Sequence, residues 1–295
     1  MADFGIETGC THYSIQPAEL AGWAESHGFE SLWFGEHTHI PTSSPPPGVS
    51  AGGEVPQFYK EVFDPFVELT AAAAVTTKLK LGTGVCLVPQ HHTINLAKTV
   101  ATLDRVSNGR FLFGIGGGWN AMEMANHGVE FKSRFRILRE RILAMKEIWT
   151  KEVAEYHGEF VNFDPIWCGP KPEQSGGPPV LMGAWSKQVP KRIAEYCDGW
   201  LPIDAGYKGG GACPDLTGAI EAIRSEVQQR GRSINKLDLS VMTAEEFAPA
   251  AGLEARIREL LKLGFKRVIF LVFPATSDKH WRQLDRYAAL IRKFA

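Results

Sequence analysis

The amino-acid sequence predicts a (β/α)8 barrel, and three observations support that prediction. Short apolar segments alternate with amphipathic segments along the chain, which is the pattern of parallel strands connected by helices. Eight such pairs can be distinguished, the number that closes a barrel of this class. The chain has 295 residues, of which 44% are hydrophobic, a size that suits either two small domains or one barrel. Since the alternation continues through both halves, we expect one domain over residues 1–295.

The expected strands are the short apolar segments at residues 4–9, 31–36, 80–88, 110–118, 179–185, 199–203, 237–242 and 267–273. A helix is expected after each strand, over residues 17–28, 65–76, 95–106, 132–149, 187–196, 216–230, 253–263 and 278–294. Pro17 and Pro65 suit helix starts, because the first turn needs no N–H donor at that position. Gly28 is a typical helix end, and Asp64 is the candidate N-cap of the second helix. In such a barrel the reactive groups lie at the C-terminal ends of the strands.

Two segments exceed this minimal unit. Residues 41–62 include the run Pro45-Pro46-Pro47-Gly48 and form a long connection after the second strand. Long connections in compact domains usually serve function, so a lid is expected here. Residues 151–178 separate the fourth helix from the fifth strand, and we expect this insertion to pass over the barrel mouth. The fourth helix carries a solvated basic face, from which one arginine can reach an anionic ligand tail: Arg134, Arg136, Arg139 and Arg141.

Composition and charge exclude several classes of partner. The formal net charge is −1 at pH 7, so the overall charge does not favour binding to nucleic acid or to an anionic membrane. The five cysteines are odd in number and contain no Cys-x-x-Cys pair, which is typical of reduced thiols. The first residues carry no basic segment of a secretory signal, and no apolar run approaches membrane-spanning length. We therefore expect a cytoplasmic protein without nucleic-acid or membrane partners.

Glycine-rich ends mark the third and fourth strands. Leu81-Gly82-Thr83-Gly84-Val85 ends the third, and Gly114-Ile115-Gly116-Gly117-Gly118-Trp119 ends the fourth. Glycine has no Cβ, so such segments let the backbone come close to a flat ligand. The second segment is not a dinucleotide motif, because Trp119 occupies the last glycine position of Gly-x-Gly-x-x-Gly, and no Gly-Lys-Ser/Thr phosphate loop occurs. The pattern predicts a binding surface for a flat cofactor.

The second strand ends with a carboxylate and two histidines, Glu36, His37 and His39. A histidine at the barrel mouth can transfer protons near neutral pH; the alternative is a loop residue that only satisfies hydrogen bonds. Another alternative is a metal site made by the histidines at positions 37, 39, 91 and 92. No His-Glu-x-x-His helix and no Cys/His pair of metal-ligand spacing supports that site, so we expect no metal.

The motifs resemble those of the bacterial luciferase-like flavin and deazaflavin oxidoreductases, and most closely the F420-dependent subgroup. The matching segments follow the family's order over most of the chain: Trp33-Phe34-Gly35-Glu36-His37, Asp64-Pro65, Leu81-Gly82-Thr83-Gly84-Val85, Ala97-Lys98, residues 102–110, residues 114–120 and Asp198-Gly199-Trp200. The resemblance implies a homodimeric enzyme that transfers a hydride between coenzyme F420 and a small organic substrate. An FMN-dependent monooxygenase is the alternative within the family. A non-catalytic flavin-binding barrel is the alternative of another class.

The resemblance also implies roles for individual residues. Glu36 and His37 would lie beside the cofactor ring, with His37 as proton donor or acceptor. The segment Thr83-Gly84-Val85 would hold a non-proline cis peptide at Gly84-Val85 against the central ring. The cofactor's other edge would contact Gly117, Gly118, Trp119 and Asn120. The cofactor phosphate would lie at a helix N-terminus beside the segment Gly183, Ala184, Trp185 and Ser186.

The sequence departs from the family pattern at two positions. Sugar-phosphate dehydrogenases of the family have an acidic residue where this chain has Trp119, and an indole can donate a hydrogen bond or orient a ligand but cannot titrate in water. Trp119 therefore remains a candidate active-site residue without an acid's role. Glu123, one helical turn later, is either a substitute for that acid or a solvated helix residue. Ala184 stands where the family often has glycine, and its methyl group narrows the approach of a phosphate.

Overall fold

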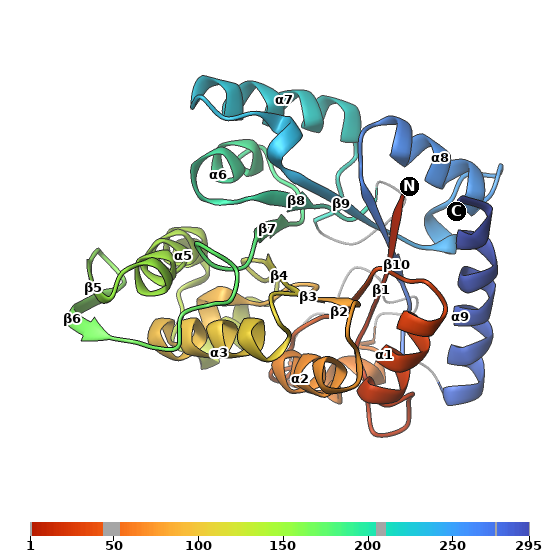
Figure 1. Ribbon diagram of the computed structural model, residues 1–295, viewed down its shortest axis with the longest axis horizontal. Coiled ribbons are helices and arrows are strands. Elements are labelled where there is room, and N and C mark those ends of the chain that lie inside the picture. The colour runs from red at the N-terminus through yellow and green to blue at the C-terminus, as the bar shows by residue number, and fades with distance from the viewer. Residues whose placement is uncertain (1, 44–53, 205–210, 275, 295) are drawn as a thin grey trace.

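Eight parallel strands close into a barrel with helices around it (Figure 1). The computed structural model describes residues 2–43, 54–204, 211–274 and 276–294. The order around the barrel is β1-β10-β9-β8-β7-β4-β3-β2. The barrel strands are β1 (Asp3–Thr8), β2 (Ser31–Phe34), β3 (Lys80–Thr83), β4 (Phe111–Ile115), β7 (Val180–Gly183), β8 (Gly199–Leu201), β9 (Asp238–Thr243) and β10 (Arg267–Leu271). The predicted fold is confirmed.

The eight predicted helices form at the predicted places. They are α1 (Pro17–Ser26), α2 (Pro65–Val75), α3 (Thr93–Val106), α5 (Arg134–Thr150), α6 (Val189–Tyr196), α7 (Leu216–Gln229), α8 (Leu253–Lys262) and α9 (Ser277–Ile291). Asp64 caps α2 as expected, because its carboxylate accepts hydrogen bonds from the N–H groups of Phe66 and Val67. Each helix presents its apolar face to the strands, so the main core lies between the two layers.

The barrel interior forms a second, smaller core. Trp33 fills it because the facing backbone is glycine: a Cβ added at Gly82 would lie 2.1 Å from the indole ring. At the N-terminal end of the strands, the buried guanidinium of Arg267 donates hydrogen bonds to Glu30 and Asp238. Burial alone would raise the pKa of Glu30, but its contacts with Arg267 and Lys80 lower it to about 2. These contacts link strand β10 with β9 and with the segment before β2, at the end opposite the mouth.

The observed strands are shorter than expected at the mouth, and some short elements were not predicted. The third strand ends at Thr83, not at residue 88, because the chain then turns into a 3-10 helix at Val88–Gln90. A short helix α4 (Ala121–Asn126) follows the fourth strand. The remaining 3-10 helices are Gln57–Lys60, Phe131–Ser133, Ile234–Lys236, Glu245–Phe247 and Arg292–Phe294. Short helices of this kind lack the long periodic pattern that a sequence can display.

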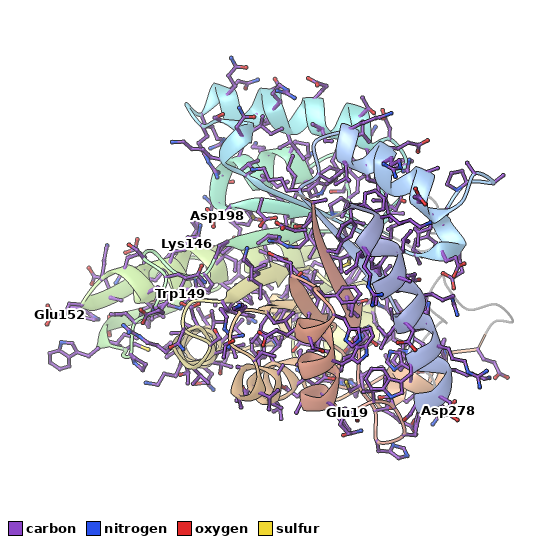
Figure 2. All side chains as sticks on the ribbon, turned by 45° about the vertical axis from the view of Figure 1, so that its right-hand side comes forward. Glu19, Lys146, Trp149, Glu152, Asp198 and Asp278 are labelled. Carbon is purple, nitrogen blue, oxygen red and sulfur yellow. The ribbon has the colours of Figure 1, made fainter. Side chains whose placement is uncertain are left out.

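The insertion at residues 151–178 contains an antiparallel hairpin, β5 (Val153–His157) and β6 (Asn162–Trp167). Figure 1 shows the hairpin beside α5, at the edge of the molecule, so the expected position over the barrel mouth is wrong. The reason is a set of hydrogen bonds from α5: the carboxylate of Glu140 accepts the N–H groups of Glu159, Phe160 and Val161. In Figure 2, Glu152 lies at this outer edge, whereas Lys146 lies beside Asp198, its ion-pair partner at 3.3 Å.

Within the described residues, no helix combines the length and apolar character needed to cross a membrane.

Candidate active site

A cavity of about 500 Å³ opens at the C-terminal ends of the barrel strands. Every barrel strand contributes to its wall, either by its last residues or by the segment that follows it. In (β/α)8 barrels, active sites lie at this end of the strands. The cavity is lined by eleven of the predicted site residues: Glu36, His37, Gly84, Val85, Gly117, Gly118, Trp119, Gly183, Ala184, Trp185 and Ser186.

The glycine-rich strand ends pack around Val85. A Cβ added at Gly116 would lie 2.6 Å from one methyl group of Val85, and a Cβ added at Gly183 would lie 2.6 Å from the other. Only glycine leaves room for this branched side chain on both sides. The peptide bond between Gly84 and Val85 is cis, the geometry that the resemblance implies. Val85 lines the cavity, and its branched side chain is stiff at χ1.

His37 is held at both ring nitrogens. Its Nδ1 lies 2.9 Å from Oε2 of Glu123, and the indole N–H of Trp119 donates to its Nε2 at 3.3 Å. Because an indole nitrogen can only donate, these contacts assign the proton to Nδ1 and leave Nε2 as an acceptor. The imidazole is 11% exposed. The pair is therefore an oriented proton acceptor on the cavity wall.

Glu123 is fully buried on α4, so the sequence alternative of a solvated helix residue is wrong. Its second oxygen, Oε1, accepts the backbone N–H of Thr38 at 3.2 Å. Asn120 positions the helix: its side-chain oxygen accepts the N–H groups of Met122 and Glu123 and so caps α4. Asn120 does not line the cavity, and its contribution to the site is to place the Glu123 carboxylate.

Thr83 also lies outside the cavity lining, since it is fully buried in the barrel wall. Its hydroxyl donates to the carbonyl of Gly114 at 2.7 Å. This hydrogen bond joins the ends of strands β3 and β4.

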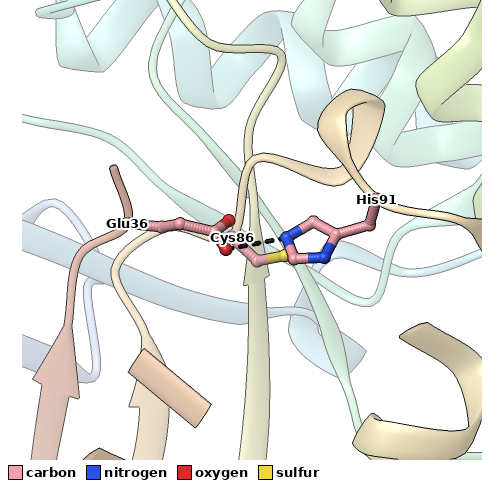
Figure 3. Close-up of side chains that lie close together, drawn as sticks. All are labelled: Glu36, Cys86 and His91. Carbon is pink, nitrogen blue, oxygen red and sulfur yellow. Dashed lines mark hydrogen bonds and ion pairs between the residues drawn. The ribbon is translucent and has the colours of Figure 1, made fainter. Parts of the chain in front are cut away.

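Glu36 lines the cavity, but its carboxylate is occupied by protein groups. It accepts the N–H of Leu87 at 2.5 Å and lies 2.7 Å from Nε2 of His91 (Figure 3). Burial would raise the pKa of Glu36, yet the hydrogen bond and charge of His91 outweigh burial and lower it. Burial would lower the pKa of His91, and the same carboxylate raises it. The two side chains form an ion pair that fixes the segment after β3.

The ligand atoms of Glu36, Cys86 and His91 lie within 4.8 Å of one another, a separation that a metal site would also have. The thiol of Cys86 lies beside the Glu36 carboxylate and helps to lower its pKa. Because the three groups satisfy one another, we interpret them as a structural polar cluster. Of the four histidines considered from the sequence, this cluster contains only His91, whereas His37 pairs with Glu123 and His39 contacts Asn126.

Two arginines form a positive region on another part of the wall. The guanidinium groups of Arg134 and Arg192 lie 4.5 Å and 3.7 Å from the ring centre of Phe135. Among the described residues, no hydrogen-bond partner faces Nε of Arg134 or Nη1 of Arg192, although both atoms are buried. Burial lowers the pKa of both groups, and the charge of Arg192 lowers that of Arg134 further. Both side chains also line the cavity, and two adjacent cations there are suited to bind an anion.

The sequence indicated that one arginine of α5 could reach an anion, and Arg134 is in that position. Arg192 was missed because it stands in α6 beside Lys191, where a basic pair is typical of a solvated surface. Ser186 and Ala184 line the cavity on the approach to α6, which begins at Val189. Ala184 has a φ of +61°, a conformation that favours glycine, which accords with the glycine expected there.

The long connection after β2 also reaches the site. Its 3-10 helix contributes Phe58 and Tyr59 to the cavity wall, and the Tyr59 ring centre lies 5.3 Å from that of His37. Residues 44–53 of the expected lid lie outside the described residues.

Comparisons with known proteins agree with this architecture. A family model described as luciferase-like monooxygenase matches residues 16–291. An uncharacterised protein of Mycobacterium tuberculosis is 42% identical over 290 residues, which are 97% of this chain and 97% of that protein. An F420-dependent glucose-6-phosphate dehydrogenase of Kineococcus radiotolerans is 28% identical over 244 residues, 80% of this chain and 66% of the dehydrogenase.

Among solved structures, the fold matches the oxygenating constituent of 3,6-diketocamphane monooxygenase from Pseudomonas putida in complex with FMN. The TM-score is 0.73 at 15% identity, over 99% of this chain and 97% of that one. At this identity the likeness shows the fold alone.

Proposed function

Because this chain belongs to the luciferase-like monooxygenase family, we propose that it is an oxidoreductase that transfers a hydride between coenzyme F420 and a small organic substrate. The observation that carries the proposal is the oriented pair of His37 and Glu123 on the wall of a glycine-lined cavity. Hydride transfer to or from an alcohol or carbonyl carbon also requires a proton to move, and this pair supplies a place for it.

The residues present fit such a cofactor in two respects. The wall at Gly117 has no Cβ, and one added there would lie 2.6 Å from the Phe135 ring, so the backbone itself forms the surface. Beside it, the guanidinium groups of Arg134 and Arg192 line the cavity, and this pair of cations suits a phosphate, which both F420 and FMN carry. A ring against Val85 and a phosphate beside the two arginines would therefore place one molecule along the cavity.

The cofactor, when bound, would supply the carbon that accepts or gives the hydride. Nε2 of His37 takes up the proton that leaves a substrate hydroxyl, or returns it in the reverse direction. Glu123 stabilises the imidazolium that results, because its carboxylate already faces the protonated Nδ1. Trp119 orients Nε2 without titrating, and its 3.3 Å contact is long enough for a substrate hydroxyl to displace.

Two considerations favour F420 over FMN. The motif set resembles the F420-dependent subgroup, and the F420-dependent dehydrogenase aligns over 80% of this chain, compared with 56% for a flavin-dependent trigonelline monooxygenase of Acinetobacter baylyi. An FMN-dependent monooxygenase is the second candidate, supported by the family model and by the flavin-dependent monooxygenase among the relatives. A non-catalytic barrel would give no reason for the fully buried Glu123 to orient a histidine in the cavity.

The decisive experiment is a titration of the purified protein with F420 and with FMN, in which binding is monitored by fluorescence. We expect F420 to bind at micromolar or lower concentration. Arg134→Gln and Arg192→Gln should each weaken binding by roughly tenfold or more, because each removes a charged donor to the phosphate. Arg136→Gln is the matched control, since Arg136 lies in the same helix, pairs with Glu159 and is 60% exposed. Binding of FMN without binding of F420 would reverse the choice of cofactor.

Catalysis is tested by mixing the loaded protein with a panel of small alcohols and carbonyl compounds and following the absorbance of the deazaflavin. Turnover of none of them, together with tight binding, would favour the non-catalytic barrel.

A further inference from the structure

The inner end of the cavity contains a carboxyl group that the mechanism above does not use. Glu7 lies on β1, opposite Trp33 of β2 and Leu271 of β10. Its side chain points into the barrel and lines the cavity. A Cβ added at Gly84 would lie 2.9 Å from its Cγ, and a Cβ added at Gly35 would lie 3.2 Å from its Oε1. Glu7 thus lies directly against the glycine that precedes Val85.

Among the described residues, no group hydrogen-bonds the Glu7 carboxyl and no cation pairs with it. Apolar side chains lie around the same point beside Gly84, namely Met242 and Trp33. Apolar surroundings disfavour a charged carboxylate and so favour the un-ionised form of this half-buried group. Burial raises its pKa well above the usual value, and Glu68 raises it further at a pH where Glu68 is itself ionised.

An un-ionised carboxylic acid has one O–H donor, and here that donor can be satisfied only from the cavity. The donor lies beside the rigid wall at Gly84 and Val85, where a flat ring would rest. Of the other ionisable side chains in the cavity wall, Glu36 and His37 are paired with protein groups. Arg134 and Arg192 lie together beside Phe135. The O–H group of Glu7 is therefore suited to a ligand that presents an uncharged hydrogen-bond acceptor at this place.

We propose that Glu7 contacts the bound cofactor and donates a hydrogen bond to an uncharged acceptor on its ring, a carbonyl oxygen or an unprotonated nitrogen. This inference rests on the proposed function, because it requires a flat heteroaromatic ring in the cavity. It adds a ring-recognition residue to the phosphate contacts and gives the inner end of the cavity a preference for neutral, acceptor-bearing rings.

The test compares wild type with Glu7→Gln and Glu7→Leu, using F420, FMN and lumiflavin as ligands. Lumiflavin is an uncharged ring without a phosphate, so its binding does not depend on the arginines. Glu7→Leu should weaken binding by about tenfold, since it leaves a buried acceptor on the ring unpaired. Glu7→Gln should stay within roughly threefold of wild type, because its amide N–H can replace the donor. Equal binding by Glu7→Leu and wild type would overturn the contact.

Glu68→Gln is the matched control. Glu68 is also a buried carboxyl with an unpartnered oxygen among the described residues, but it lies on α2 and does not line the cavity. This variant should leave ligand affinity unchanged. A loss of affinity as large in Glu7→Gln as in Glu7→Leu would mean that the ligand requires a negative charge, and it would overturn the neutral donor.

Infrared spectroscopy supplies a readout that needs no turnover. Wild type should have a C=O stretching band of an un-ionised carboxylic acid that Glu7→Gln removes and Glu68→Gln retains, and this band should move to lower frequency when ligand binds. A band that is absent, or that does not respond to ligand, contradicts the proposal. If lumiflavin binds but neither cofactor does, the proposed function fails while the Glu7 contact is still measured; if none of the three binds, both fail.

Discussion

At the scale of single residues, the site depends on how His37 is oriented. Its Nδ1 faces a fully buried carboxylate and its Nε2 faces the cavity side, where Trp119 contacts it. A free histidine on a loop would sample several ring orientations, and only some of them would present Nε2 to a ligand. Burying Glu123 on a capped helix removes that freedom, because the carboxylate cannot follow the ring outward.

We expect His37→Ala to lower turnover by about a hundredfold or more, the loss typical of a missing general acid or base, with cofactor affinity changed by only a few fold. Glu123→Gln should lower turnover less, since its amide can still contact the ring but no longer stabilises a positive imidazolium. The measurement is steady-state turnover of the F420-loaded protein beside the fluorescence titration. Near-wild-type turnover in His37→Ala would make this histidine a loop residue only.

The candidate site was predictable where it follows a strand end. Residues such as His37, Gly84 and Gly117 stand directly after apolar segments, and barrel geometry brings such positions together. The sequence left open whether Glu123 is buried or solvated, because its burial depends on α4, a helix of six residues without a periodic pattern. Glu7 was missed although a signal existed: strand alternation places it on the same face as Gly5, toward the barrel interior.

At the scale of elements, positions were predictable and ends were not. The strands at residues 80–88 and 110–118 were expected too long, because Gly84 and Gly116 continue the apolar pattern while the backbone already leaves the barrel. The hairpin of β5 and β6 was not predicted within the insertion, since most of its residues are exposed or half-buried and their alternation is weak. Its turn is tied to α5 by the carboxylate of Glu140 and by the ion pair of Arg136 with Glu159, contacts that no periodicity reveals.

The contact between α2 and the segment after β1 predicts a pH dependence of stability. Burial raises the pKa of Glu68, on α2, to about 8, although the N–H of Cys10 donates to this carboxylate at 2.7 Å. The folded protein therefore holds a proton that the unfolded chain releases above about pH 4.5. By linkage, the contribution of Glu68 to the free energy of unfolding falls as pH rises from about 4.5 to about 8, and is constant above that range.

Glu68→Gln cannot release this proton and keeps an oxygen for Cys10, so its stability relative to wild type should increase across the same window. Urea unfolding of both proteins at a series of pH values measures the difference, and other titrating groups cancel in it. Parallel curves for the two proteins would mean that Glu68 is ionised in the folded state.

At the scale of the whole molecule, the cavity belongs to the barrel as a unit. All eight barrel strands or the segments after them contribute to its wall, from Glu7 near the N-terminus to Leu271 near the C-terminus. A ligand there contacts groups that are separated by almost the entire chain. The single domain over residues 1–295 and the homodimer implied by the family resemblance remain predictions.

Because the wall draws on every barrel strand, a bound cofactor should stabilise the whole barrel against unfolding. At a free concentration of about 100 times its Kd, it should add about 2.7 kcal/mol to the free energy of unfolding if it binds only the folded protein. We expect tryptophan fluorescence, which reports on eight tryptophans spread from Trp23 to Trp281, and far-ultraviolet circular dichroism to shift together in urea. If one probe keeps its midpoint when the cofactor is added while the other moves, part of the chain unfolds independently of the cavity, and the protein is not one cooperative domain.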